Sequence, residues 1–176
     1  MHSSGTSFML RLMLLRHAHA GHPPGLQDHQ RPLSDRGHRE AEAVGAYMVS
    51  HGLRPDVAIV STAVRAQQTW QHVLRAFGGA VEFLDEARLY EASVGLIVQR
   101  IQELKPGIHT VLLVGHNPGV ALAAQSLCGD GDASALELLH DAYPPASLAV
   151  VDFDADQWGQ VAQGSGQLER FVMPEP

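Results

Sequence analysis

Short apolar runs of strand length alternate along this chain with longer segments of helical periodicity. Runs rich in aliphatic or β-branched side chains predict strands at residues 9–15, 57–60, 81–84, 110–114, 147–153 and 167–172. An alternation of strands and helices is typical of a mostly parallel sheet with helices on both faces. No other feature of the sequence constrains the fold as strongly.

A helix is predicted in each of the four gaps between the first five strands. Ser34 is placed to cap the first helix, and Gly52 to end it. The second carries an apolar stripe that stops at Gly78-Gly79, and the third stops at Pro106-Gly107.

The fourth helix is predicted to begin at Asn117 as its N-cap, with Pro118 in the first helical position, and to run through Leu127. Residues 130–145 are expected to be rich in loops, because Gly, Pro and Asp recur there. The last two strands flank a turn-rich segment, so we expect them to form an antiparallel hairpin.

These elements predict an α/β fold: a three-layer α-β-α sandwich with a mostly parallel central sheet and one or more antiparallel edge strands. A chain of 176 residues with 45% hydrophobic content is suited to one domain with a substantial core. We expect a flexible N-terminal tail over residues 1–7 and a single domain over residues 8–176.

Composition argues against several classes of function. The formal net charge is −7 and there is no basic run, so nucleic acid is not an expected partner. A single cysteine, Cys128, builds neither a disulfide framework nor a cysteine-based zinc site. No apolar stretch reaches the roughly 20 residues that span a bilayer. We therefore expect a cytoplasmic protein that does not associate with membranes.

Chemically versatile side chains follow three of the predicted strands. The first strand is followed by Arg16 and His17, the second has Arg65 one helical turn beyond its end, and the strand at 110–114 is followed by His116 and Asn117. Ligands of open α/β sheets bind beyond the carboxyl ends of the strands. These side chains are therefore expected to meet at one edge of the sheet.

Two arginines and two histidines without a neighbouring carboxylate suit an oxyanion better than a metal ion. Arginine donors match phosphate oxygens, and a helix opening at Asn117 would add backbone N–H groups. Magnesium, in contrast, requires carboxylates. Each residue alone has a plainer interpretation, as a loop histidine or a surface ion-pair partner, but the four together are difficult to explain that way. Arg31 either reaches the rim of this pocket or forms a surface ion pair.

Five sequence blocks, in order over roughly residues 9–150, resemble those of the histidine phosphatase superfamily. The blocks are Leu15-Arg16-His17-Ala18, Arg31-Pro32-Leu33-Ser34 with Gly37, the segment 61–69 (STAVRAQQT), Leu89-Tyr90-Glu91-Ala92, and Val114-Gly115-His116-Asn117-Pro118. The alanine at position 18 and the compact length are similar to the SixA-type phosphohistidine phosphatases of this superfamily, whose fold is that of phosphoglycerate mutase.

The resemblance implies a phosphatase that requires neither metal nor cofactor. His17 would attack phosphorus and carry a phosphohistidine intermediate, while Arg16, Arg65 and His116 hold the phosphoryl oxygens, with Arg31 and Asn117 as further binding residues. His116 would work best when protonated. The substrate would be phosphohistidine on a protein of the HPt or phosphocarrier type.

Other roles remain open on the sequence. Glu91 is the leading candidate for the acid that protonates the leaving group, ahead of Asp28 and Asp35. His19 stands where many SixA-type relatives have lysine, which would make the charge at the pocket mouth depend on pH. The alternatives to a protein phosphatase are a phosphatase for small phosphate esters, a non-catalytic module that binds phosphoprotein, and a metal-binding protein rich in histidine.

Overall fold

The structure, a computed structural model, describes residues 9–174. The expected tail at residues 1–7 therefore lies outside the described residues. The strands are β1 Met9–Arg16, β2 Val57–Val60, β3 Glu82–Asp85, β4 Thr110–Gly115, β5 Cys128–Gly131, β6 Leu148–Asp154 and β7 Gly166–Val172. The helices are α1 Asp35–Ser50, α2 Val64–Ala76, α3 Val94–Gln102, α4 Gly119–Leu127 and α5 Ala133–Asp141, with short 3-10 helices η1 Asp28–Gln30, η2 Ala87–Leu89 and η3 Trp158–Gln160.

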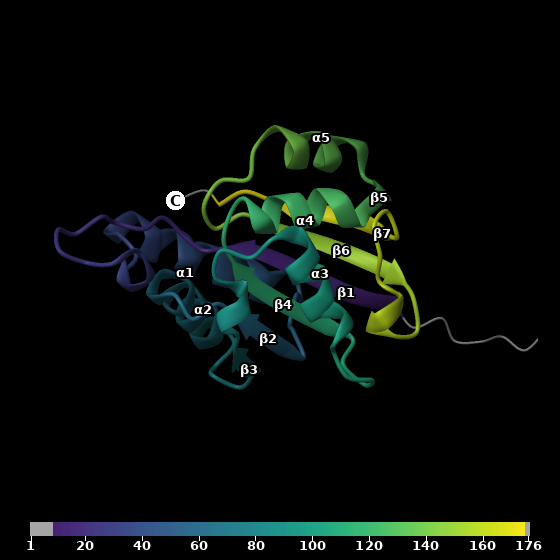
Figure 1. Ribbon diagram of the computed structural model, residues 1–176, viewed down its shortest axis with the longest axis horizontal. Helices are drawn as coiled ribbons and strands as arrows, with labels where there is room; N and C mark the ends of the chain where they lie inside the picture. The colour runs from purple at the N-terminus through teal and green to yellow at the C-terminus, as the bar shows by residue number, and fades with distance from the viewer. Residues whose placement is uncertain (1–8, 175–176) are drawn as a thin grey trace, which may run out of the picture.

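The strands form one seven-stranded sheet in the order β3-β2-β4-β1-β6-β7-β5 (Figure 1). β1, β2, β3 and β4 are mutually parallel, and β5 is parallel to β7. β6 pairs antiparallel with both β1 and β7, as predicted for the last two strands. It lies inside the sheet, however, and not at an edge, because β7 and β5 extend the sheet beyond it.

Alternate residues of β1 pack into two separate hydrophobic cores, one on each face of the sheet. Leu12 and Leu14 pack in the core that α3, α4 and α5 cover. Met13 and Leu15 pack in the core beneath α1 and α2. Successive side chains of a strand point to opposite faces, so an uninterrupted apolar strand is expected where both faces are covered. The predicted three-layer sandwich is confirmed (Figure 1).

The prediction that residues 130–145 are mainly loop was wrong. β5 and α5 occupy most of this segment. β5 has the sequence CGDG, which carries no β-branched signal, and it pairs with β7 where glycine allows close approach of the backbones. A Cβ at Gly129 would lie 2.0 Å from the carbonyl oxygen of Gly164. The signal for α5 was present in Asp132, whose side chain accepts a hydrogen bond from the backbone N–H of Ala135.

The start of α4 also differs from the prediction by one residue. The helix begins at Gly119, with Pro118 in the cap position, and the Asn117-Pro118 peptide is cis. The Asn117 side chain still accepts a hydrogen bond from the backbone N–H of Ala121, at 3.3 Å. No helix within residues 9–174 is long and apolar enough to cross a membrane.

Candidate active site

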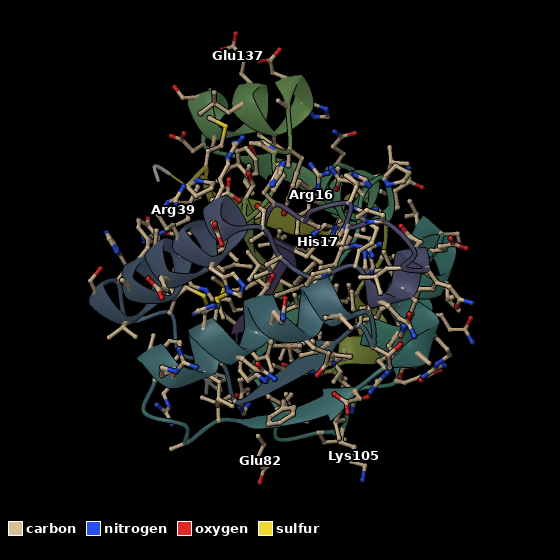
Figure 2. All side chains as sticks on the ribbon, turned by 90° about the vertical axis from the view of Figure 1, so that its left-hand side faces the viewer. Arg16, His17, Arg39, Glu82, Lys105 and Glu137 are labelled. Atoms are coloured by element: carbon tan, nitrogen blue, oxygen red, sulfur yellow. The ribbon has the colours of Figure 1, made fainter. Side chains whose placement is uncertain are left out.

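The carboxyl ends of β1, β2 and β4 bring His17, Arg65 and His116 together. Arg16 ends β1 beside Gly115, which ends β4, so the histidines that follow are neighbours. Their ring centroids are 5.1 Å apart. Arg65, in the first turn of α2, places its Nε 3.3 Å from Nε2 of His17. In Figure 2, Arg16 and His17 lie near the centre of the view, with green helices above them and blue and teal helices below.

The backbone around His17 is fixed by hydrogen bonds from three parts of the chain. The N–H of His17 donates to the carbonyl of Gly115, and the N–H of Ala18 donates to the hydroxyl of Thr69. The N–H of Ala146 donates to the carbonyls of Arg16 and His17. The end of β1 is therefore held on the sheet, on α2 and on the segment before β6.

His17 is held as a neutral imidazole with a defined tautomer. Its Nδ1 lies 2.7 Å from the carbonyl oxygen of Ala18, which can only accept, so Nδ1 carries the proton and Nε2 carries the lone pair. Burial lowers the pKa of His17 to about 3, against the opposing effect of the Ala18 hydrogen bond. Nearby His116, Arg65 and Arg16 lower it further. An unprotonated Nε2 is the form that a nucleophile requires.

Burial also favours a neutral His116 in this structure, while the protonated form expected from the sequence concerns the ring with a phosphate bound. Burial lowers its pKa to about 4 and is a larger cause than Arg65. Nε2 lies 2.7 Å from the hydroxyl of Ser61, and Nδ1 is buried without a hydrogen-bond partner among the described residues. A dianion beside the ring would act in the opposite direction and favour the protonated form.

The two arginines differ in how fully they are engaged. Arg16 donates through Nη1 to the carbonyl of Tyr143 at 2.9 Å, while its buried Nε has no partner among the described residues. Burial lowers the pKa of Arg16. Arg65, in contrast, donates to both the backbone carbonyl and the carboxylate of Asp28, at 2.6 and 3.1 Å. A partly buried cation with an unused buried donor is suited to receive an anion.

A cluster around Asp28 adjoins these residues, and only part of it was anticipated. Asp28 accepts from Arg65, from Arg31 at 2.8 Å and from the hydroxyl of Tyr90. His29 contacts the Thr62 hydroxyl through Nε2 at 2.9 Å. Sequence reasoning treated Asp28 only as a weak candidate acid and assigned no role to Tyr90 or His29. The available signal was the position of Tyr90 within one resembling block and of Asp28 and His29 three and two residues before another.

The remaining predicted residues lie around this centre. Glu91 lines the same cavity as Arg65 and His116, and its backbone adopts a left-handed φ of 56°. Arg31 contacts the carbonyl of Gly21 and Asp28, so it reaches the centre through Asp28. Asn117 donates to the Tyr143 carbonyl at 3.0 Å, which occupies its amide nitrogen within the protein. Its binding of substrate stays a prediction.

Asp35 is the first residue of α1, and His19, in the loop after β1, contacts the residue that caps this helix. Nδ1 of His19 is 2.7 Å from the hydroxyl of Ser34, and its backbone N–H donates to the buried carboxylate of Glu40. These contacts place His19 in the packing between the loop after β1 and α1. The close approach of His19 to α1 also explains why position 37 is a glycine, because a Cβ there would lie 1.9 Å from the His19 carbonyl oxygen.

A cavity of about 480 Å³ opens onto the centre. It is lined by Asp28, Arg65, Tyr90, Glu91, Ala92, Ser93, His116, Asn117, Pro118 and Gly119. A larger cavity of about 670 Å³ lies between β3 and the end of α3 and contains none of the predicted site residues. The smaller cavity is therefore the one that brings Arg65 and His116 together with Tyr90 and Glu91.

Comparisons with known proteins agree with this geometry. The family model for the histidine phosphatase superfamily (branch 1) matches residues 12–105. An uncharacterized protein of Mycobacterium tuberculosis strain H37Rv is 32% identical over 163 residues, which cover 91% of this chain and 99% of that protein.

Two solved structures are similar over nearly the whole chain. A candidate phosphohistidine phosphatase SixA from Nakamurella multipartitia has a TM-score of 0.83 at 29% identity, over 96% of this chain and 98% of that one. A candidate SixA from Agrobacterium tumefaciens has a TM-score of 0.76, also at 29% identity, over 94% and 98%. With its predicted fold confirmed and its sequence matched over most of its length, this chain belongs to the histidine phosphatase superfamily, branch 1.

Proposed function

We propose that this chain is a phosphatase that removes phosphoryl groups from phosphohistidine on proteins through a covalent intermediate on His17. The observation that carries the proposal is the state of His17. Its Nδ1 is committed to the Ala18 carbonyl, so the lone pair of Nε2 lies beside Arg65 and His116. A base that is neutral and oriented beside a cationic donor is suited to attack phosphorus and not merely to bind phosphate.

In the first step, Nε2 of His17 attacks phosphorus in line, and the bond from phosphorus to the leaving group breaks. The leaving group departs with the bonding pair and takes up a proton. In the second step water attacks phosphorus, the bond to Nε2 breaks, and inorganic phosphate is released. Nδ1 keeps its proton throughout, since the Ala18 carbonyl stabilises the charge that the ring gains on phosphorylation.

The phosphoryl oxygens would be held by Arg16, Arg65 and His116. Arg16 has an unused buried donor, and Arg65 is fixed beside the nucleophile. His116 would take up a proton when the dianion binds, because the nearby negative charge raises its pKa above the value of about 4 in the unliganded protein. Charge spreads over these oxygens in the transition state, so fixed donors there lower the barrier.

Glu91 is the group that we assign to protonating the leaving group. It lines the cavity, and its side chain makes no hydrogen bond with residues 9–174. Asp28 is less suitable, because the Tyr90 hydroxyl, Arg31 and Arg65 hold its pKa well below the usual range. The left-handed backbone at Glu91 is a conformation that functional sites retain more often than other positions do.

A protein substrate is supported by the open rim of the cavity and by the similarity to SixA-type structures. Tyr90 and Glu91 at the cavity are partly or fully exposed, and Asp28 is exposed as well. An HPt-type or phosphocarrier protein could present its phosphohistidine there. Metal independence is part of the proposal, and turnover is expected to persist in EDTA.

The proposal is tested by turnover on a phosphohistidine-bearing HPt domain, compared with a small phosphomonoester. We expect a higher kcat/KM for the phosphoprotein, and no turnover of either substrate by His17→Ala. A higher kcat/KM for the small ester would indicate a small-molecule phosphatase. Binding of the phosphoprotein without turnover would indicate a binding module, and either result would contradict the proposal.

A further inference from the structure

We infer that Asp28 is a positioning residue: it locks Arg65 in the phosphate-binding orientation and fixes the ring of Tyr90 against His116. This inference rests on the proposed function of the same site. It assigns to Asp28 a role different from the acid that the sequence had left open, and it extends the site to a residue of the short helix η1, outside the three strand ends.

Asp28 supplies two of the three contacts that orient the guanidinium of Arg65. Nη1 donates to the Asp28 carbonyl at 2.6 Å, Nη2 donates to its carboxylate at 3.1 Å, and Nε lies 3.3 Å from Nε2 of His17. The guanidinium is planar, so contacts to all three nitrogens determine its position and its tilt. Without the Asp28 carboxylate, Nη2 would lose its partner, and the tilt of the guanidinium would depend on the contacts of Nε with His17 and of Nη1 with the Asp28 carbonyl.

Asp28 is itself held by separate parts of the chain. Arg31 donates to its other carboxylate oxygen at 2.8 Å and is fixed in turn by the Gly21 carbonyl. The next residue, His29, is tied to Thr62 after β2 at 2.9 Å. The short helix η1 is therefore docked on the site, and Asp28 has a defined position although its side chain is 49% exposed.

Tyr90 connects Asp28 to the aromatic wall of the cavity. Its hydroxyl donates to the same carboxylate oxygen that accepts from Arg65. Its ring stands edge-on to His116, with centroids 5.5 Å apart, and edge-on to His29 at 4.9 Å. The guanidinium carbon of Arg65 lies 5.9 Å from the ring centroid. One carboxylate thus sets the positions of a phosphate ligand and of the ring beside it.

The charge of Asp28 suits it to positioning and not to proton donation. The hydrogen bond from Tyr90, followed by those from Arg31 and Arg65, holds its pKa well below the usual range. Asp28 is therefore ionised at neutral pH and has no proton to give. Its negative charge also raises the pKa of His116, in opposition to burial and Arg65.

The test compares Asp28→Asn, Tyr90→Phe and the double variant with a matched control, Glu137→Gln. Glu137 is an exposed acid on α5, and its side chain points away from the site (Figure 2). Asparagine keeps the shape of Asp28 and removes its charge, while phenylalanine keeps the ring of Tyr90 and removes only its hydroxyl. Thermal unfolding of each variant reports whether the fold is intact.

Two kinds of phosphate ester separate positioning from acid catalysis. Asp28→Asn is expected to lower kcat/KM by about 10²-fold, the loss typical of a misplaced binding group, equally for p-nitrophenyl phosphate and for an alkyl phosphate. A proton donor contributes less to the hydrolysis of p-nitrophenyl phosphate, because p-nitrophenolate is a good leaving group without protonation. A loss confined to the alkyl ester would therefore overturn the inference and make Asp28 the acid.

The connection through Tyr90 predicts non-additive losses. Tyr90→Phe is expected to lose less activity than Asp28→Asn, and the double variant is expected to lose no more than Asp28→Asn alone, because residues of one network are coupled. Losses that multiply would show that Asp28 and Tyr90 act independently.

Two readouts do not depend on turnover. Binding of tungstate, a phosphate-like oxyanion, is expected to weaken in Asp28→Asn and to stay unchanged in Glu137→Gln. The pKa of His116, followed by NMR, is expected to fall in Asp28→Asn. Unchanged tungstate affinity would contradict the role of Asp28. If the wild-type protein bound tungstate but hydrolysed nothing, the proposed function would fail while this inference could still be decided.

Discussion

The two histidines of the site, His17 and His116, differ in the contacts of their ring nitrogens. In His17 the Ala18 carbonyl fixes the proton on Nδ1, while in His116 Nδ1 has no partner among the described residues and Nε2 meets the Ser61 hydroxyl. Buried imidazoles without an acidic partner lose their proton readily. In the proposed mechanism the ring of His17 is therefore the nucleophile, and the ring of His116 gains a proton when an anion binds.

We expect NMR titration to show this difference directly. In the unliganded protein both rings should be neutral at pH 6.5, the ordinary pKa of histidine, since burial lowers their pKa values to about 3 and about 4. Tungstate should raise the pKa of His116 by adding negative charge. An ordinary pKa for His17 in the unliganded protein would contradict the neutral nucleophile.

Glu91 gives a second prediction at the scale of single residues. Glu91→Gln should reduce kcat/KM for alkyl phosphates by about 10²-fold or more, the usual contribution of a general acid. The loss should be smaller for phosphohistidine, since transfer from one imidazole to another needs less help from an acid. Parallel kinetics on both substrates measure the difference. Equal losses would show that Glu91 binds or positions without donating the proton.

At the scale of elements, the segment before α1 is joined to the loop after β1. The carbonyl of His19 accepts from the N–H of Ser34, and Ala20 forms a bridge with Leu33. Leu33 in turn donates its N–H to the side chain of Gln68 on α2, at 2.8 Å. These contacts explain why the block 31–34 and the block 61–69 occur together with Arg16 and His17. They join the loop that follows His17 to the start of α1 and to α2.

The close approach at Gly37 predicts a large effect from a single methyl group. Gly37→Ala places a Cβ 1.9 Å from the His19 carbonyl oxygen, so α1 or the loop must move. We expect the free energy of unfolding to fall by about 1–3 kcal/mol or more, as in overpacked cores. Urea unfolding measures this change.

Gly95→Ala is the matched control for Gly37→Ala. Gly95 lies in α3, and a Cβ there would meet no atom within 4 Å. Alanine should raise the stability of that helix by about 0.5–1 kcal/mol. Similar results for the two variants would mean that the contact at Gly37 does not constrain the loop.

At the scale of the whole molecule, buried neutral histidines make stability depend on pH. The pKa values of His17 and His116 are lower in the folded protein than the ordinary 6.5, so the unfolded chain binds more protons between pH 6.5 and about 3 to 4. Stability therefore rises with pH through this window and is lost on acidification. Carboxylates with lowered pKa values, such as Asp28 and Glu86, contribute below about pH 4.5.

This dependence is measurable by urea unfolding at several pH values. The wild-type protein should lose at most a few kcal/mol between pH 6.5 and pH 4.5 through these two rings. A variant with His17→Asn and His116→Asn should show a shallower slope over the same range. An identical slope in the variant would mean that the two histidines titrate normally.

Sequence alone predicted most of the fold because its strongest signals are local. The apolar strands and the Ser34 cap depend on side chains that stand within a few residues of one another. β5 and the position of β6 inside the sheet depend on distant pairing. Four residues reading CGDG carry no strand signal until β7 lies beside them.

The prediction of the site residues divides in the same way between local sequence signals and contacts of distant residues. Arg16, His17, Arg65 and His116 stand at strand ends or one turn beyond, where the topology of a parallel sheet gathers them. The roles of Asp28 and Tyr90 come from contacts between residues 62 positions apart, which no local pattern predicts. Burial of His116 was missed for a similar reason, because it depends on how the surrounding elements pack.

The phosphorylated state of His17 is the central claim, and rapid-quench trapping tests it most directly. The protein is mixed with an HPt domain labelled on its phosphohistidine, and the products are quenched in acid and in alkali. We predict an alkali-stable, acid-labile label on the wild-type protein that maps to His17 and is absent from His17→Ala. Absence of label from the wild-type protein, with turnover unchanged in His17→Ala, would contradict the account.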